Sequence, residues 1–198
     1  MKIGVKLFGG ILFLLACSIP AFGGVIVNEI MYHPASTNVL EEWLELYNTG
    51  PTNVNLSGWQ ITKGVAFTFP TNTVLATGGY IVVAADGPTF TSRNPVVANF
   101  VAGWSGSLGH LLELSDDAGR VVNSIEFYHE GDWALRALGP VQFAHRGWEW
   151  FAEHDGLGKS LELINPILPN AYAHNWGSST VTGGTPGRAN SIASTCVR

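Results

Sequence analysis

The stretch HLLELSDDAGRVVNSIEF, residues 110–127, indicates the fold class of the chain. Its two halves, 110–115 and 120–127, have the composition of β-strands. Between them, Asp-Asp-Ala-Gly is typical of a turn. The stretch therefore predicts a β-hairpin.

Similar short strands are expected on both sides of this hairpin. They lie at 25–32, 42–48, 58–62, 66–70, 78–85 and 159–164. Seven to nine short strands with turns every 8–12 residues predict an all-β, antiparallel sandwich. Helix signals are almost absent, and residues 145–154 fit a helix and a strand equally well. The tail after residue 164 is rich in Pro, Gly, Asn and Ser, so we expect it to be irregular and packed across the sandwich.

The N-terminus predicts export. Lys2 and Lys6 accompany about ten apolar residues, a run too short to span a bilayer but suited to a signal peptide. Small residues before the bond predict cleavage after Gly23, which makes residues 1–23 a signal peptide. The alternative is a lipid anchor at Cys17. Either interpretation places the chain outside the cytoplasm, secreted or at the cell envelope, with no transmembrane segment after signal removal.

Charge and cysteine content exclude several classes of protein. The formal net charge is −5 and no basic run occurs, which argues against a nucleic-acid partner. The two cysteines, Cys17 and Cys196, form no internal disulfide once the signal peptide is removed, and they rule out a cysteine-based zinc site. A chain of this length can build an apolar core, and we expect a monomer.

The stretch HDGLGKSLEL, residues 154–163, resembles the end of a phosphate-binding loop. Such a loop needs a glycine at the position of Glu153 and a helix after Ser160. Here a carboxylate would repel phosphate, and the following residues alternate like a strand that ends at Pro166. The stretch is therefore interpreted as a turn that leads into a strand.

Catalytic and metal-binding patterns are weak. The neighbouring pairs Glu41-Glu42 and Asp116-Asp117 are interpreted as a solvated strand start and a turn, because adjacent strand residues face opposite ways. We predict no enzyme and no cofactor. The alternative is a metal-dependent hydrolase that uses His129, His145 and His154.

The seven tryptophans carry the remaining interest. Those at 43, 59 and 176 are expected in the core. Residues 128–157 are expected to form a compact aromatic-rich flap, with one of Trp148 and Trp150 buried and the other exposed. The long loop yields a candidate binding surface of Tyr128, Trp133, Trp148 and Trp150.

Several pieces of sequence together resemble the lamin-tail domain family in its bacterial secreted form. They are VIVNEIMYHP, EEWLELYNTG, NLSGWQIT, FTFPTNTVLATGGYIVVA, DDAGRVVNSIEF, DGLGKSLELINP, NWGSS and GGTPGRANS. The resemblance implies an immunoglobulin-like antiparallel β-sandwich over residues 24–191, followed by a short extension at 192–198.

The same resemblance implies a module without catalytic activity. We expect a binding, adhesive or structural role at the cell envelope, toward an unidentified protein or glycan. The other interpretation is that the chain is the truncated N-terminal part of a larger multidomain secreted protein.

Overall fold

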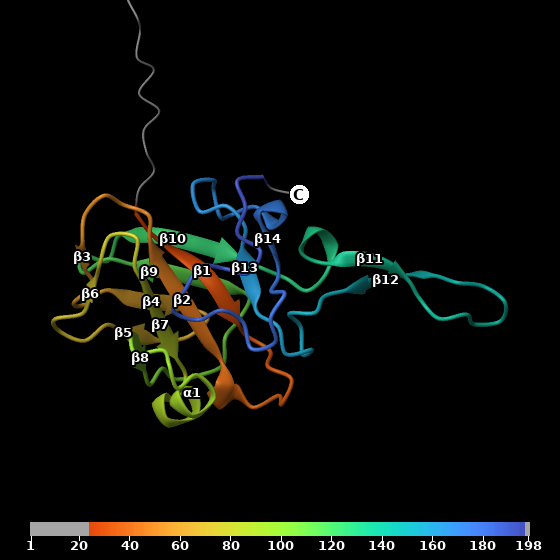
Figure 1. Ribbon diagram of the computed structural model, residues 1–198, viewed down its shortest axis with the longest axis horizontal. Coiled ribbons are helices and arrows are strands. Elements are labelled where there is room, and N and C mark those ends of the chain that lie inside the picture. The colour runs from red at the N-terminus through yellow and green to blue at the C-terminus, as the bar shows by residue number, and fades with distance from the viewer. Residues whose placement is uncertain (1–23, 197–198) are drawn as a thin grey trace, which may run out of the picture.

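The computed structural model describes residues 24–196 and shows two stacked β-sheets with a hairpin that projects from them (Figure 1). Within these residues the larger sheet has six strands and the smaller sheet four. The larger sheet runs in the order β14 (Trp176–Ser178), β13 (Leu161–Leu163), β1 (Val25–Met31), β2 (Trp43–Asn48), β7 (Tyr80–Ala84) and β8 (Phe100–Ala102). The smaller runs in the order β10 (Val121–Glu126), β9 (Leu111–Ser115), β4 (Gln60–Lys63) and β5 (Phe67–Thr68).

Two short sheets complete the β-structure. One pairs β3 (Val54–Asn55) with β6 (Val74–Leu75), and the other pairs β11 (Leu135–Leu138) with β12 (Trp148–Phe151). Single 3₁₀ turns occur at Val39–Glu41 (η1), Gly131–Trp133 (η2) and Ala173–Asn175 (η3).

The core lies between the two large sheets. Alternate residues of the larger sheet, such as Ile30, Leu44 and Leu161, are buried there against Leu112 and Ile125 of the smaller sheet. Burying an aliphatic side chain of this size stabilises the fold by about 1.5–3 kcal/mol. The all-β, immunoglobulin-like β-sandwich predicted from the sequence is confirmed.

The hairpin predicted over residues 110–127 is also confirmed, as β9 paired antiparallel with β10. At its turn the Asp116 carboxylate accepts the backbone N–H groups of Ala118 (3.0 Å) and Arg120 (2.9 Å). These hydrogen bonds, chiefly the one from Arg120, lower the pKa of Asp116. Gly119 takes a left-handed φ of 75° that suits glycine.

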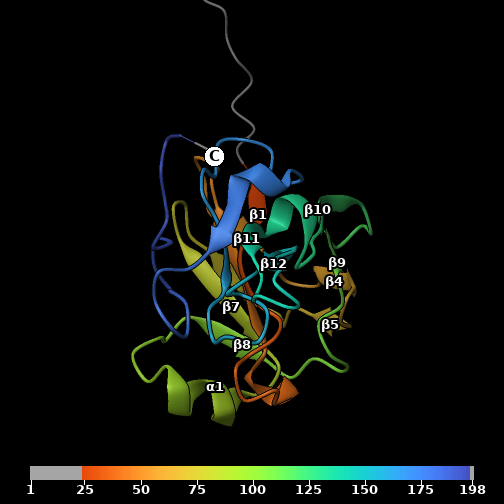
Figure 2. The same ribbon diagram turned by 90° about the vertical axis from the view of Figure 1, so that its right-hand side faces the viewer.

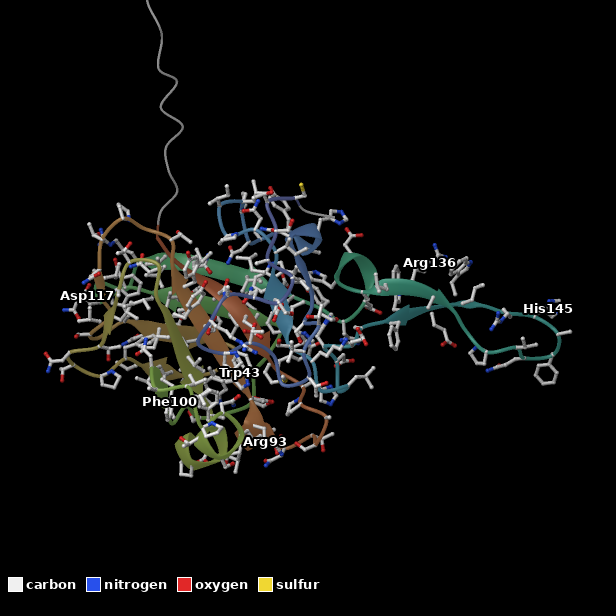
Figure 3. All side chains as sticks on the ribbon, viewed as in Figure 1. Trp43, Arg93, Phe100, Asp117, Arg136 and His145 are labelled. Carbon is white, nitrogen blue, oxygen red and sulfur yellow. The ribbon has the colours of Figure 1, made fainter. Side chains whose placement is uncertain are left out.

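Helix α1 (Gly87–Arg93) and the parallel pairing of β7 with β8 were not expected from the sequence. The local signal was present, because the Asp86 side chain accepts the N–H of Thr89 (2.8 Å) and a proline stands in the first turn. The parallel pair follows from the helix, which carries the chain back across the sheet. Trp43 and Phe100, both labelled in Figure 3, pack with Phe90 of α1.

Both faces of the larger sheet are covered. The inner face meets the smaller sheet, while the outer face meets α1 and a C-terminal segment, residues 179–195, which we call the strap (Figure 2). The irregular, packed tail expected from the sequence is thus observed, although part of it forms η3 and β14.

The predicted signal peptide, residues 1–23, lies outside the described residues, and Cys17 lies there with it. In the part of the chain that is described, no helix has the length and apolar character needed to cross a bilayer.

Candidate functional site

Residues 134–152, which we call the arm, form a β-hairpin that extends away from the sandwich (Figure 1). Each residue of β11 and β12 is exposed. At the tip, Gln142 and His145 exchange two backbone hydrogen bonds of 2.8 and 2.9 Å. Phe143 and Ala144 between them have φ of 49° and 63°, a conformation unusual for bulky side chains. Phe143 is 98% exposed.

The two indoles of the arm lie on the same face. Trp150 pairs with Arg136, which Figure 3 labels, and Trp148 pairs with Leu138. The Arg136 guanidinium lies 5.2 Å from the Trp148 ring centroid. Trp148 is 58% and Trp150 50% exposed. The expectation of one buried and one exposed ring is wrong, because residues two apart on a strand point to the same side. The expected compact flap is likewise an extended hairpin.

A cavity of about 290 Å³, which we call the root pocket, lies where the arm meets the sandwich. Three chain segments line it, residues 131–136, 150–153 and 173–178. Trp133 and Trp150 belong to it, so the structure brings together two of the four residues of the candidate surface. The Trp133 ring is 6.3 Å from the ring of Trp176, a buried residue of β14.

Tyr128 is not among the residues that line the root pocket. Its ring stacks on His110, with centroids 5.6 Å apart, and its hydroxyl donates to Glu126. The candidate surface therefore divides into the arm, with the root pocket at its base, and a separate tyrosine.

The three histidines of the hydrolase alternative do not converge. His145 is at the tip of the arm (Figure 3), whereas His154 is buried near Tyr128. His154 accepts from the Ser178 hydroxyl (2.9 Å) and donates to the Tyr128 carbonyl (3.3 Å). Burial lowers its pKa, which favours the neutral ring. Among residues 24–196, no group of three His, Cys, Asp or Glu side chains is placed to hold a metal ion.

The HDGLGKSLEL stretch forms a turn followed by strand β13, as predicted. Gly156 and Gly158 have positive φ of 77° and 83°, and the Lys159 amine pairs with the Glu153 carboxylate at 2.8 Å. Lys159 is thus ion-paired with Glu153, the residue at the position where a phosphate-binding loop needs glycine.

The sequence profile of the Lamin Tail Domain matches residues 18–129. The chain belongs to the lamin tail domain family. No curated protein matches the chain. The matched range of this lamin tail domain ends just before the arm, so the arm, β13, β14 and the strap lie outside it.

The chain also contains a row of three buried carboxyl groups that was not recognised in the sequence. Glu29 on β1 pairs across the sheet with Glu45 on β2 and with Glu162 on β13. All three side chains are on the outer face of the larger sheet, beneath the strap, and none is exposed to solvent. These glutamates alternate with apolar residues, a pattern typical of strands with one solvated face. The sequence pattern therefore did not indicate that the three carboxyl groups are buried.

The strap supplies hydrogen bonds to each carboxyl group. Glu29 accepts the backbone N–H of Thr185 (2.8 Å), Glu45 accepts that of Gly187, and Glu162 accepts that of Ile192 (3.1 Å). The motifs NEI and GGTPGRANS, distant in sequence, therefore meet in space. Burial is the main cause that raises the pKa of Glu29 well above its ordinary value and the pKa of Glu45 to about 8.

The Thr185 hydroxyl links two carboxyl groups of this row. It lies 3.1 Å from Glu29 Oε2 and 2.7 Å from Glu162 Oε1, and it has one hydrogen to donate. Burial, and then the nearby Glu45 and Glu162 carboxyl groups, raise the pKa of Glu29, which favours its protonated form.

Glu42 is a further buried carboxyl group. It accepts from the Ser107 hydroxyl (2.7 Å) and the Leu108 N–H (2.8 Å), and burial raises its pKa. The interpretation of Glu41-Glu42 as a solvated strand start is wrong for Glu42, because the connection from β8 to β9 covers it.

A larger depression, of about 570 Å³, lies between α1, the turn after β1 and the strap. On its wall, Arg93 (Figure 3) forms an ion pair with Glu41. The tryptophan in this wall, Trp43, is buried, whereas the arm carries two exposed indoles, so we take the arm and the root pocket as the candidate site.

Proposed function

We propose that this lamin tail domain is an exported, non-catalytic module that attaches to cell-envelope material through its arm. The immunoglobulin-like family is consistent with a module that binds rather than catalyses. The N-terminal sequence supports export, and the arm supplies a surface for attachment. In this proposal the module acts as a monomer and has no nucleic-acid partner.

The exposure of Trp148 and Trp150 is the observation that carries the proposal. An isolated two-stranded hairpin is only marginally stable in water, and the arm gains no core from these rings. Large apolar side chains gathered on an exposed surface typically mark interaction sites. Tryptophan and arginine side by side are also the residues that contribute most to binding at interfaces.

The tip of the arm supports the same role. Phe143 is held in a left-handed conformation that costs about 1–2 kcal/mol for an ordinary residue, and its ring faces solvent. Neither feature helps the fold.

Co-sedimentation with purified bacterial cell envelopes tests the proposal. The Trp148→Ala and Trp150→Ala variants should each be retained at least about tenfold less than the unchanged protein, since central aromatic residues often contribute more than 1.4 kcal/mol. Val121→Ala, an exposed apolar residue of β10, is the matched control. Equal retention of all variants would refute attachment through the arm.

The export part has its own test. Mass spectrometry of the mature protein should find an N-terminus at Gly24 without lipid. A lipid-modified N-terminus at Cys17 would instead establish the anchored form.

A further inference from the structure

We infer that the root pocket binds one or two rings of an uncharged saccharide. The inference rests on the proposed envelope attachment and names the chemistry of the material that the arm would meet.

The aromatic side chains of the pocket suit the apolar side of a sugar ring. Trp133 comes from η2 and Trp150 from β12, so indoles from two segments approach the same cavity. A pyranose presents C–H groups on one side and hydroxyls around its edge. Tryptophan matches this because it combines a large apolar ring with one polar N–H group.

The polar side chains suit the hydroxyl edge. Asp132 and Glu153 provide hydrogen-bond acceptors, while Arg136 and His174 provide donors. Asp132 Oδ2 lies 3.9 Å from His174 Nε2, which places an acceptor and a donor side by side. Adjacent sugar hydroxyls, each a donor and an acceptor, can use such a pair.

Charge and size disfavour other ligands in the root pocket. Two acidic side chains lie beside two basic ones, so the lining offers no excess of positive charge for a phosphate group or a nucleic acid, and four ionisable side chains oppose a lipid chain. The volume of about 290 Å³ is at the lower end of the range for small-molecule sites. A protein partner would instead need about 800 Å² of contact on each side.

The pocket is held in shape by the sandwich. Trp133 packs on the buried Trp176, and Glu153 is fixed by its ion pair with Lys159 at 2.8 Å. Little ordering is then needed when a ligand enters, which preserves affinity.

Two binding measurements test the inference. The first is titration of the protein with N-acetylglucosamine oligomers, followed by tryptophan fluorescence. We expect saturable binding that Asp132→Asn weakens about tenfold and Trp150→Ala at least tenfold. Glu149→Gln is the control, because this carboxylate is on the opposite face of the arm and does not line the pocket.

The second measurement is co-sedimentation with envelopes before and after their digestion with proteinase K, which removes protein and leaves glycan. We expect arm-dependent retention to survive the digestion. Retention that the digestion abolishes would identify a protein partner and overturn the saccharide inference, while the proposed function would stand.

The remaining outcomes also separate the two proposals. Oligomer binding that depends on Asp132 and Trp150, without envelope retention, would keep the saccharide site and overturn the envelope role. Oligomer binding that both variants leave unchanged would place the sugar elsewhere and overturn the inference. Absence of binding to oligomers and envelopes alike would overturn both proposals.

Discussion

The strap and the arm differ in the groups that they bury and expose. The strap places hydroxyl and backbone N–H groups against three buried carboxyl groups, so polar groups are satisfied inside the fold. The arm holds tryptophan, leucine and phenylalanine in solvent, where they add nothing to the core. Polar chemistry therefore stabilises this lamin tail domain in one region, and apolar chemistry is available for binding in another.

The two regions should respond differently to substitution. A buried polar network is costly to disrupt, because each orphaned donor or acceptor loses about 1–3 kcal/mol. An exposed ring loses almost no contact when it is removed. The following predictions use this difference.

Glu29→Ala should have the largest effect on stability. It leaves the Ser160 hydroxyl and the Thr185 N–H buried without their acceptor. We expect a loss of about 3–5 kcal/mol in the free energy of unfolding, measured with urea. Glu130→Ala at an exposed position should change it by less than about 0.5 kcal/mol. A loss below about 1 kcal/mol for Glu29→Ala would contradict the structural role of the row.

Gly184→Ala should come next, with a loss of about 2–4 kcal/mol. A methyl group there would overlap Glu29 and lie 2.6 Å from Ser160 Oγ, in a backbone with φ of 76°. Gly183→Ala is the matched control, because it has a similar φ of 86° but open space around it. The control should lose only about 1 kcal/mol, so equal losses would show that the strap does not press on the carboxyl row.

The carboxyl row should also make stability depend on pH. An acid whose pKa is raised by folding contributes stability that is lost as pH rises through the folded pKa, which is about 8 for Glu45. The lowered pKa of His154 has the opposite effect, but only below about pH 6.5. Between about pH 6.5 and 8, stability should therefore fall by up to about 1.4 kcal/mol per pH unit for each such carboxyl group.

Chemical denaturation at a series of pH values measures this slope. Glu45→Gln should reduce it, because the amide does not titrate, while Glu130→Gln should leave it unchanged. Stability that rises with pH across this window would mean that the carboxyl groups are ionised in the folded state without penalty.

Trp148→Ala should have the smallest effect, below about 0.5 kcal/mol, because the ring is exposed on an arm without a core. Trp176→Ala in β14 should cost about 3–5 kcal/mol, since that ring is buried and its N–H donates to the Asn170 carbonyl at 2.8 Å. Comparable losses in the two variants would show that the arm folds against the sandwich in solution.

The sandwich was predictable because its signals are local. The Asp-Asp-Ala-Gly turn, the alternation in β9 and β10, and the turn before β13 each depend on neighbours in sequence. Helix α1 also had a local signal, the Asp-Gly-Pro start, but its composition resembled a turn. That both arm indoles lie on the same face follows from strand geometry once Trp148 and Trp150 are placed on one strand.

The sequence by itself determined the fold class, the family and most strands, because period-two alternation and turn residues act over a few positions. Only the tertiary structure decided which polar residues are buried. Glu29, Glu45 and Glu162 have the pattern of a solvated sheet face. Their burial depends on Thr185 and Gly187 of the strap, which lie more than twenty residues after β13 in the sequence. Likewise, the root pocket exists because three separate segments converge. Convergence of that kind is set by long-range packing, which leaves no periodic trace in the sequence.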